Sequence, residues 1–539
     1  MMQVGRSRGR SGSEQPPQGE RGWSLAFHAQ RRLGSITTAA LVLAALVPTT
    51  AAASGYDPAS DMNSMYNTAQ YVGATAFWDA GYTGAGVDVA LIDTGVSPVE
   101  GLVTADKVIH GPDLSFESQN DSLRSLDTNG HGTFMAGLIA GKDDTLATPY
   151  SAAPASAYRG IAPDARIVSL KVGVADGGVD VSQVIAAIDW VVEHRHDNGL
   201  NIRVLNLSFG TNSTQPYGVD PLAFAVEQAW KHGIFVVAAT GNSGYVAKTG
   251  TLTNPAYDPK IFAVGASDSM GTATIDDDSV PAFSSTGSND RSPDVVAPGT
   301  HLVGLRVPGS YVDQRFGDTG YVSDRFFRGS GTSAAAAVAS GEAALVIQQR
   351  PSITPNQLKK LFLMTAQGLT GFSTRRAGAG VVDLRGTLTA PTYYAPAKWN
   401  TIAWSTGAGS LESARGSDHL TADGVVLSGE QDIFGHSFNA PAMAALEAAG
   451  SSWSGGTWNG STWSGSSWSD SGWNGSTWSG SSWSGSSWSG SSWSDSSWSG
   501  IRWSGSSWSG SSWSGSSWSG SSWSGSSWSE SGWSLGSWS

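Results

Sequence analysis

Four side chains that can carry acid–base or nucleophilic chemistry follow one another along the chain: Asp93, His131, Asn242 and Ser333. A serine hydroxyl is a weak nucleophile unless a base takes its proton, and an imidazole titrates near the right pH for that task. A buried carboxylate can hold the imidazole in one tautomer and stabilise its charged form. A side-chain amide can donate to the oxyanion of a tetrahedral intermediate. These residue types are therefore the parts of a serine hydrolase.

Ser333 is predicted to lie at the start of a helix. It follows Gly331-Thr332 and leads into residues 334–349, most of which are strong helix formers. The first turn of a helix has unpaired N–H groups and the positive end of the helix dipole, which favour developing negative charge. Serine is also a common helix cap, so Ser333 alone does not identify a nucleophile. The other three residues, in this order, favour the catalytic interpretation.

Strands and helices alternate in the part of the chain that contains these residues. Apolar, β-branched runs typical of buried strands recur at 86–93, 165–172, 202–208, 234–240 and 261–265. Helical patterns occupy 181–194, 220–232, 334–349 and 354–366. This alternation predicts an α/β fold, a three-layer sandwich with helices on both faces of a mainly parallel sheet. Sites in such sheets form at the carboxyl ends of strands, where Asp93, Ser208 and residues 240–242 fall.

Order and local motifs together resemble the subtilisin-like serine peptidases, the subtilase family. The resemblance covers about residues 71–388, and its motifs are 92–96, 129–133, 160–165, 238–244, 296–299, 331–333 and 378–383. It implies that Asp93 is the orienting acid, His131 the general base and Ser333 the nucleophile. It also implies that Asn242 donates to the oxyanion.

The resemblance also identifies candidate substrate contacts. Residues 207–210 look like the strand that lines the family's substrate channel, where a peptide adds as an extra strand through main-chain hydrogen bonds. The substrate-binding residues expected on this basis are Ser208, Phe209, Gly210, Thr240 and Gly241. No cofactor is expected. The family often binds structural calcium, but no acidic loop of this chain is diagnostic of a metal site.

Two positions depart from the family pattern. The usual Met-Ala-Ala-Pro after the nucleophile is Ala334 to Ala337, and the usual second histidine after the His-Gly-Thr motif is Phe134. Ala334 is closer to the related sedolisins, which use a glutamate as base and an aspartate at the oxyanion position. His131 and Asn242 argue against that family. A lipase or esterase is disfavoured because no Gly-x-Ser-x-Gly elbow surrounds Ser333.

The first 53 residues are predicted to be a signal peptide. Six arginines precede or flank an apolar run at 36–47, and small residues at 51–53 suit cleavage near Ala53. The apolar run is too short to span a bilayer comfortably, so no stable transmembrane anchor is expected. The interval 54–92 leaves little room for the pro-domain of many family members. The protein is therefore expected to be secreted.

Composition excludes some partners and emphasises the core. The 539-residue chain has a formal net charge of -13, which disfavours nucleic acid because phosphates must be met by Lys and Arg. It has no cysteine, so an exported form must be stabilised by its core, and in part by any bound ions, rather than by disulfides.

The end of the chain is a low-complexity repeat. Eighteen of the 24 tryptophans recur every fifth residue between Trp453 and Trp538, mostly as Ser-Ser-Trp-Ser-Gly. Period five fits neither a helix stripe nor one strand face. The segment could form stacked short strands, one pentapeptide per step, or remain a solvated spacer. The predicted organisation is a signal peptide at 1–53, a peptidase domain at 54–388, a linker or docking segment at 389–450 and a repeat tail at 451–539.

Two functions follow from these features. The first is a secreted serine endopeptidase that hydrolyses polypeptides through an acyl-enzyme. The alternative is a cell-surface or wall-binding adhesive protein that acts through its tryptophan tail and has a weak or vestigial peptidase module. In that case the exposed aromatic faces would stack on the sugar rings of a cell-wall polysaccharide.

Overall fold

The computed structural model describes residues 55–120, 122–244, 250–422, 425–454 and 456–462, together with the short pairs 476–477 and 487–488. The predicted signal peptide and most of the predicted repeat tail lie outside the described residues. Within the described part, no helix combines the length and the apolar character that crossing a bilayer requires.

A seven-stranded sheet, with every neighbouring pair parallel, is the middle layer of the fold. Its strands, in spatial order, are β2 (Val108–Asp113), β3 (Arg166–Lys171), β1 (Asp88–Asp93), β4 (Ile202–Leu207), β5 (Phe235–Ala239), β6 (Phe262–Ser267) and β7 (Val295–Pro298). Every residue of β1, β5, β6 and β7 is buried. Strands covered on both faces are apolar along most of their length, which explains the apolar runs between their ends.

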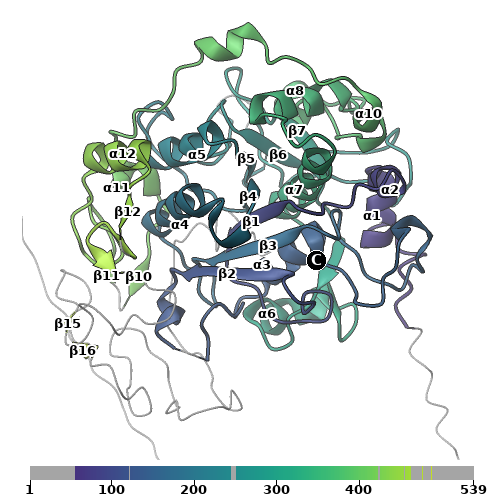
Figure 1. Ribbon diagram of the computed structural model, residues 1–539, viewed down its shortest axis with the longest axis horizontal. Helices are drawn as coiled ribbons and strands as arrows, with labels where there is room; N and C mark the ends of the chain where they lie inside the picture. Colours follow the sequence, from purple (N-terminus) through teal and green to yellow (C-terminus); the bar gives the residue numbers. More distant parts are fainter. Residues whose placement is uncertain are drawn as a thin grey trace, which may run out of the picture. The chain divides into compact units, whose positions relative to one another are not determined.

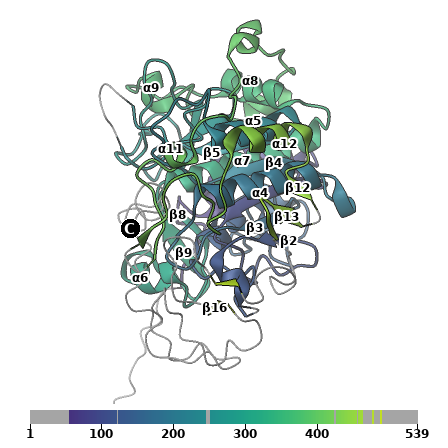
Figure 2. The ribbon, with the colours of Figure 1, turned by 90° about the vertical axis from the view of Figure 1, so that its left-hand side faces the viewer.

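Helices cover both faces of this sheet. Figure 1 shows α4 (Val181–His194) and α5 (Pro221–Lys231) on one side of the strands, and α3 (His131–Ala140) and α7 (Thr332–Gln349) on the other. Figure 2, turned by 90°, shows α4 and α5 in front of the sheet. Helices α3 and α7 pack against each other, and α7 also packs on β4 to β7. The predicted three-layer α/β sandwich is confirmed.

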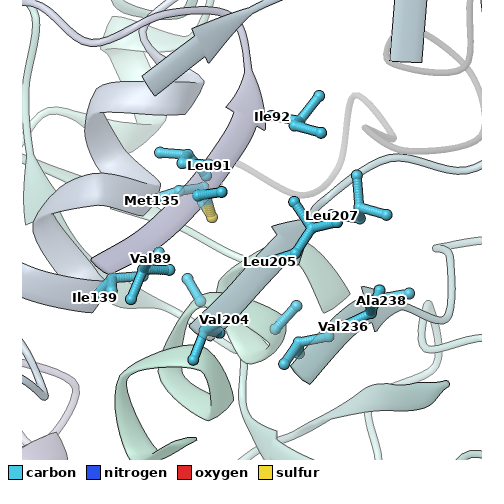
Figure 3. Packing of buried hydrophobic residues seen from close by; sticks show 14 of the residues in the cluster. Val89, Leu91, Ile92, Met135, Ile139, Val204, Leu205, Leu207, Val236 and Ala238 are labelled. Atoms are coloured by element: carbon cyan, nitrogen blue, oxygen red, sulfur yellow. The ribbon is translucent and has the colours of Figure 1, made fainter. Parts of the chain in front are cut away.

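The core between β1, β4 and α3 follows the alternation of side chains along the strands. Val89 and Leu91 point to the face covered by α3, where Ile139 and Met135 meet them, whereas Ile92 points to the opposite face (Figure 3). All five side chains are at most 2 % exposed. This packing fixes the last residue of β1, Asp93, relative to the first residue of α3, His131.

The remaining elements of residues 55–389 surround these layers. They are α1 (Met65–Tyr71), α2 (Ala74–Asp79), α6 (Tyr311–Gly320), α8 (Pro355–Thr365), α9 (Thr374–Ala377), α10 (Leu384–Thr389), and the antiparallel ribbon of β8 (Leu302–Leu305) and β9 (Phe326–Gly329).

A C-terminal segment then returns to α4 and α5, and we call its described residues within 404–462 the C-terminal strap. Its elements are α11 (Leu411–Arg415), β10 (Thr421–Ala422), β11 (Val425–Val426), α12 (Ala440–Ala449), β12 (Trp453–Ser454), β13 (Thr457–Trp458) and β14 (Ser461–Thr462). Beyond it, β15 (Ser476–Thr477) pairs with β16 (Ser487–Trp488). Helix α12 packs on α5, α11 on both α4 and α5, and β12 on α4.

The strap is joined to α4 by buried polar contacts. Arg415 forms an ion pair with Asp180, the N-cap of α4, at 2.6 Å between Nε and Oδ2, and neither side chain is exposed. The indole N–H groups of Trp453 and Trp458 donate to Ala186 O and Asp189 Oδ2 of the same helix. The first two tryptophans of the repeat are thus part of the domain's core.

Candidate active site

Asp93 and His131 form a buried pair at the carboxyl end of β1. Imidazole Nδ1 lies 2.6 Å from Asp93 Oδ1, and the two side chains are at most 1 % exposed. An ionised carboxylate can only accept hydrogen bonds, so Nδ1 carries the proton and Nε2 keeps its lone pair. Asp93 also accepts from the Thr94 backbone N–H at 2.8 Å, which fixes the carboxylate plane. The imidazole is therefore held in the tautomer that a general base requires.

Burial shifts the pKa of both residues in this pair. It lowers the pKa of His131 well below its ordinary value, because an imidazolium is poorly solvated in the core. Burial also raises the pKa of Asp93, and the hydrogen bond from the Thr94 backbone N–H opposes that rise. His131 is thus neutral at pH 7 and can accept a proton.

Ser333 lies in the first turn of α7 and next to the end of β4. Its Oγ is 3.4 Å from the carbonyl oxygen of Ser208, and the hydroxyl of Ser208 donates to the carbonyl of Ser333 at 3.3 Å. Helix α7 begins at Thr332 rather than at the predicted Ala334, so Ser333 is inside the helix rather than its cap. Its backbone N–H is one of the unpaired donors of a helix start.

The sheet register brings these two groups together. Ile92 of β1 pairs with Leu207 of β4, so the residues that follow them, Asp93 and Ser208, occupy neighbouring positions at the ends of adjacent strands. Adjacent strands are about 4.8 Å apart. His131 is hydrogen-bonded to Asp93, and Ser333 to Ser208. The imidazole and the hydroxyl therefore both lie at the carboxyl ends of these two central strands.

The Asn242 side chain lies against the start of α7. Its Oδ1 accepts from both the backbone N–H and the hydroxyl of Thr332 at 3.0 Å, which holds the amide group beside the helix start. A Cβ placed on Gly331 would lie 3.6 Å from Asn242 Nδ2 and 3.8 Å from the Ser333 nitrogen. Gly331 therefore leaves open the small space that both donors border, as an oxyanion site requires.

The predicted substrate contacts flank this space. Ser208, Phe209 and Gly210 continue directly from β4, whereas Thr240 and Gly241 follow β5. The side chains of Phe209 and Thr240 are buried, so these segments can meet a ligand only through their backbone or small side chains. The Gly241 N–H donates to the hydroxyl of Thr332, which ties this loop to α7.

In the part of the chain that the structure describes, no group of three or more His, Asp or Glu side chains is arranged to hold a metal ion such as the structural calcium that the family often binds.

Sequence comparison decides the family. The subtilase family model matches residues 84–386, more than half of the chain. The chain belongs to the subtilase family. The serine protease AprX of Bacillus subtilis (strain 168) is 34% identical over 307 residues, which are 56% of this chain and 66% of AprX. Subtilisin DY of Bacillus licheniformis is 32% identical over 290 residues, 54% of this chain and 86% of that protein.

A third relative matches a region of similar length. Subtilisin Savinase of Lederbergia lenta is 32% identical over 312 residues, which cover 58% of this chain and 94% of Savinase. All three matches leave more than two fifths of this chain outside the alignment. The matched part is a subtilisin-like serine endopeptidase domain.

The departures from the subtilase pattern have a packing explanation. Phe134 is 1 % exposed, and its ring lies against Gly304 of β8, where an added Cβ would come within 2.8 Å of the ring. Ala334 to Ala337 are all buried in α7, which packs on four strands at once. Small side chains allow the helix to approach the sheet this closely.

Sequence reasoning overlooked Asp127, Thr94 and Gly331. Asp127 and Thr94 bind the backbone around His131, and Gly331 borders the donors described above. Asp127 stands four residues before His131, so its proximity in sequence was the available signal.

Proposed function

We propose that this protein is a secreted serine endopeptidase that cleaves polypeptide chains through an acyl-enzyme on Ser333. The observation that carries the proposal is the 2.6 Å contact between His131 Nδ1 and Asp93 Oδ1 at the end of β1. The end of the neighbouring strand β4 leads into Ser208, which contacts Ser333. Membership of the subtilase family supports the same reaction.

In the first half of the reaction, Ser333 Oγ attacks the peptide carbonyl while His131 Nε2 takes the hydroxyl proton. Asp93 stabilises the imidazolium and does not itself become protonated. Asn242 Nδ2 and the Ser333 N–H donate to the oxyanion. The imidazolium then gives its proton to the leaving amine, and the C–N bond breaks. Water then attacks the carbonyl of the acyl-enzyme, with His131 again as the base, and the ester bond to Ser333 breaks to release the acid product.

The peptide is proposed to lie along Ser208, Phe209 and Gly210 as an added strand, with Thr240 and Gly241 on the other side. This arrangement uses main-chain hydrogen bonds, so the enzyme can accept many sequences. It needs an extended substrate, and an unfolded protein is therefore the appropriate first probe.

The test compares the full chain with Ser333→Ala, using an unfolded protein as substrate and a serine-directed covalent inhibitor as label. Ser333→Ala is expected to lower kcat by a factor on the order of 10⁶ and to abolish labelling. Asn242→Ala is expected to lower kcat by about 10² to 10³, a magnitude measured on a subtilisin. Ser340→Ala is the matched control, because Ser340 is a buried serine of the same helix that donates to Asn206 instead.

An intact substrate and an unlabelled wild-type protein would reject the proposal. Export is tested separately by sequencing the N-terminus of the protein recovered outside the producing cells. A start close to Ser54 is expected, and a start at Met1 would contradict export through a cleaved signal peptide.

A further inference from the structure

A second buried carboxylate, Asp127, stands beside the Asp93–His131 pair. Asp127 is 2 % exposed, and three donors surround it. Its Oδ1 accepts from the Gly130 N–H and from the Thr94 hydroxyl, and its Oδ2 accepts from the Thr133 N–H, each at 2.7 Å. Burial raises the pKa of Asp127, and the hydrogen bonds from Thr133, Gly130 and Thr94 oppose that rise; the two backbone N–H groups can only donate, so they favour the ionised carboxylate.

These donors bracket His131. Gly130 precedes the histidine, Thr133 follows it by two residues, and the Gly132 N–H between them donates to the Thr94 hydroxyl at 2.9 Å. The N-cap of α3 is Gly130, which has no side chain to satisfy the first N–H groups of the helix. The Asn129 side chain accepts from the His131 N–H at 3.2 Å, and Thr94 and Asp127 accept from the next two N–H groups.

Thr94 also connects Asp127 to Asp93. The Thr94 hydroxyl is 2.7 Å from Asp127 Oδ1 and 3.2 Å from Asp93 Oδ1, so its proton goes to Asp127, the nearer carboxylate. The charge of Asp127 thus lies one hydroxyl away from the acid that orients His131. After burial, this charge is one of the causes that raise the pKa of Asp93.

We propose that Asp127 is a positioning residue for peptide hydrolysis, which fixes the start of α3 so that His131 keeps its bond to Asp93 and which stabilises the imidazolium by its negative charge. The inference rests on the proposed peptidase function. The two roles are separable, because position acts on the rate at every pH, whereas charge moves the pH at which His131 protonates.

The experiment uses the full chain as wild type and as Asp127→Asn, Thr94→Val, Thr94→Ser and Ser97→Ala. The Ser97 hydroxyl contacts only the main chain of Asp127, accepting from its N–H at 3.1 Å and donating to its carbonyl at 3.3 Å, so Ser97→Ala is the control for loop anchoring. Active sites are counted with a serine-directed covalent inhibitor. Turnover of a chromogenic peptide is then expressed per active site between about pH 5 and 9.

In Asp127→Asn, the new NH2 group faces one of the backbone N–H groups that donated to the carboxylate. Two donors then face each other, and that hydrogen bond is lost. We expect kcat per active site to fall by about 10²-fold with KM nearly unchanged, because the base moves out of alignment. We also expect the acid limb of the kcat/KM profile to move to lower pH, because a lost negative charge makes the imidazolium less stable. Thr94→Val should reproduce part of the loss, Thr94→Ser should restore it, and Ser97→Ala should leave the acid limb in place.

An Asp127→Asn protein with wild-type kcat per site and an unchanged acid limb would overturn the inference. So would a loss of activity that only follows the number of intact sites, since that would mean a purely structural role. A wild-type protein that neither turns over peptide nor takes the label refutes the peptidase function itself, so the two failures are distinguishable.

Discussion

The indole N–H of Trp458 donates a 2.7 Å hydrogen bond to Asp189 Oδ2, and the tryptophan side chain is fully buried. Trp458 belongs to the second pentapeptide of the repeat, and Asp189 belongs to α4 of the catalytic domain. Opposite Asp189, the carboxyl group of Glu447 on α12 is also buried. This contact joins the repeat to the core of the enzyme.

Removing the indole N–H should destabilise the whole protein. Trp458→Phe leaves Asp189 Oδ2 buried without this donor, and we expect a loss of about 1–3 kcal/mol in the free energy of unfolding. Urea denaturation followed by fluorescence measures it. Leu446→Ala, a half-exposed position on α12, should change the stability by less than about 0.5 kcal/mol. Equal stability of Trp458→Phe and wild type would show that the strap unfolds separately.

The strap should also loosen as the pH rises. Burial raises the pKa of Asp189 to about 8 and raises that of Glu447, with the charge of Asp189 as a second cause for Glu447. Both groups titrate near about 4 in an unfolded chain. The folded protein thus keeps protons that the unfolded chain has lost. Their stabilisation is complete below about pH 4 and declines as the pH rises to about 8.

Glu447→Gln is the variant that tests this pH dependence. We expect the free energy of unfolding to fall less steeply between about pH 4 and 8 in Glu447→Gln than in wild type. Glu193 shares this interface and accepts from Ser452 and Trp453, so it stays unchanged in the comparison. Glu100→Gln removes an exposed carboxylate and corrects for net charge. Parallel curves for wild type and Glu447→Gln would contradict the prediction.

The buried ion pair between Arg415 and Asp180 should show strong coupling. Arg415→Met leaves the Asp180 charge in the core, and we expect a loss of about 3–5 kcal/mol. Asp180→Asn keeps a helix cap for α4 while removing that charge. The double variant should therefore be more stable than the sum of the two single losses implies, as a double-mutant cycle of urea unfolding would measure. Simple additivity would show that the pair is not coupled.

The activity should persist below the ordinary titration range of histidine. Burial lowers the pKa of His131, and its neutral form is the base, so kcat/KM should reach half its plateau below about pH 6.5. A pH–rate profile of the wild-type enzyme with a peptide substrate measures this midpoint. A midpoint above that value would mean that the charge of Asp93 outweighs the desolvation of His131.

Sequence patterns predicted best the elements whose periodicity is undisturbed by neighbours. Residues 181–194 form α4 with the predicted bounds, because its apolar positions and the capping box at Asp180 both mark where it begins. Strand β2 was not predicted. It contains Gly111 and Pro112 and is only partly buried at the sheet edge, so its apolar run is interrupted. Residues 296–299 were identified only as a motif and not as a strand, yet Val295–Pro298 form β7, because β6 supplies a parallel partner.

Within the site, the order and motifs of the sequence predicted the contact between Asp93 and His131. They did not predict the helix start at His131 itself, since the N-cap Gly130 has no side chain and the first N–H groups of α3 donate to Asn129, Thr94 and Asp127 instead. They also could not show how the repeat packs. Trp453 and Trp458 pair across two-residue antiparallel strands, a geometry that depends on the surface of α4 rather than on period five.

The packing of Trp453 and Trp458 determines where the chain can be truncated. A truncated protein that ends at Gly450 would lack both indole rings and expose the apolar surface of α4 that they cover, so it would be prone to aggregation. A truncated protein that ends at Thr462 would keep that surface covered while lacking the later pentapeptides. Fusions and truncations should therefore treat the first twelve residues of the repeat, 451–462, as part of the folded enzyme.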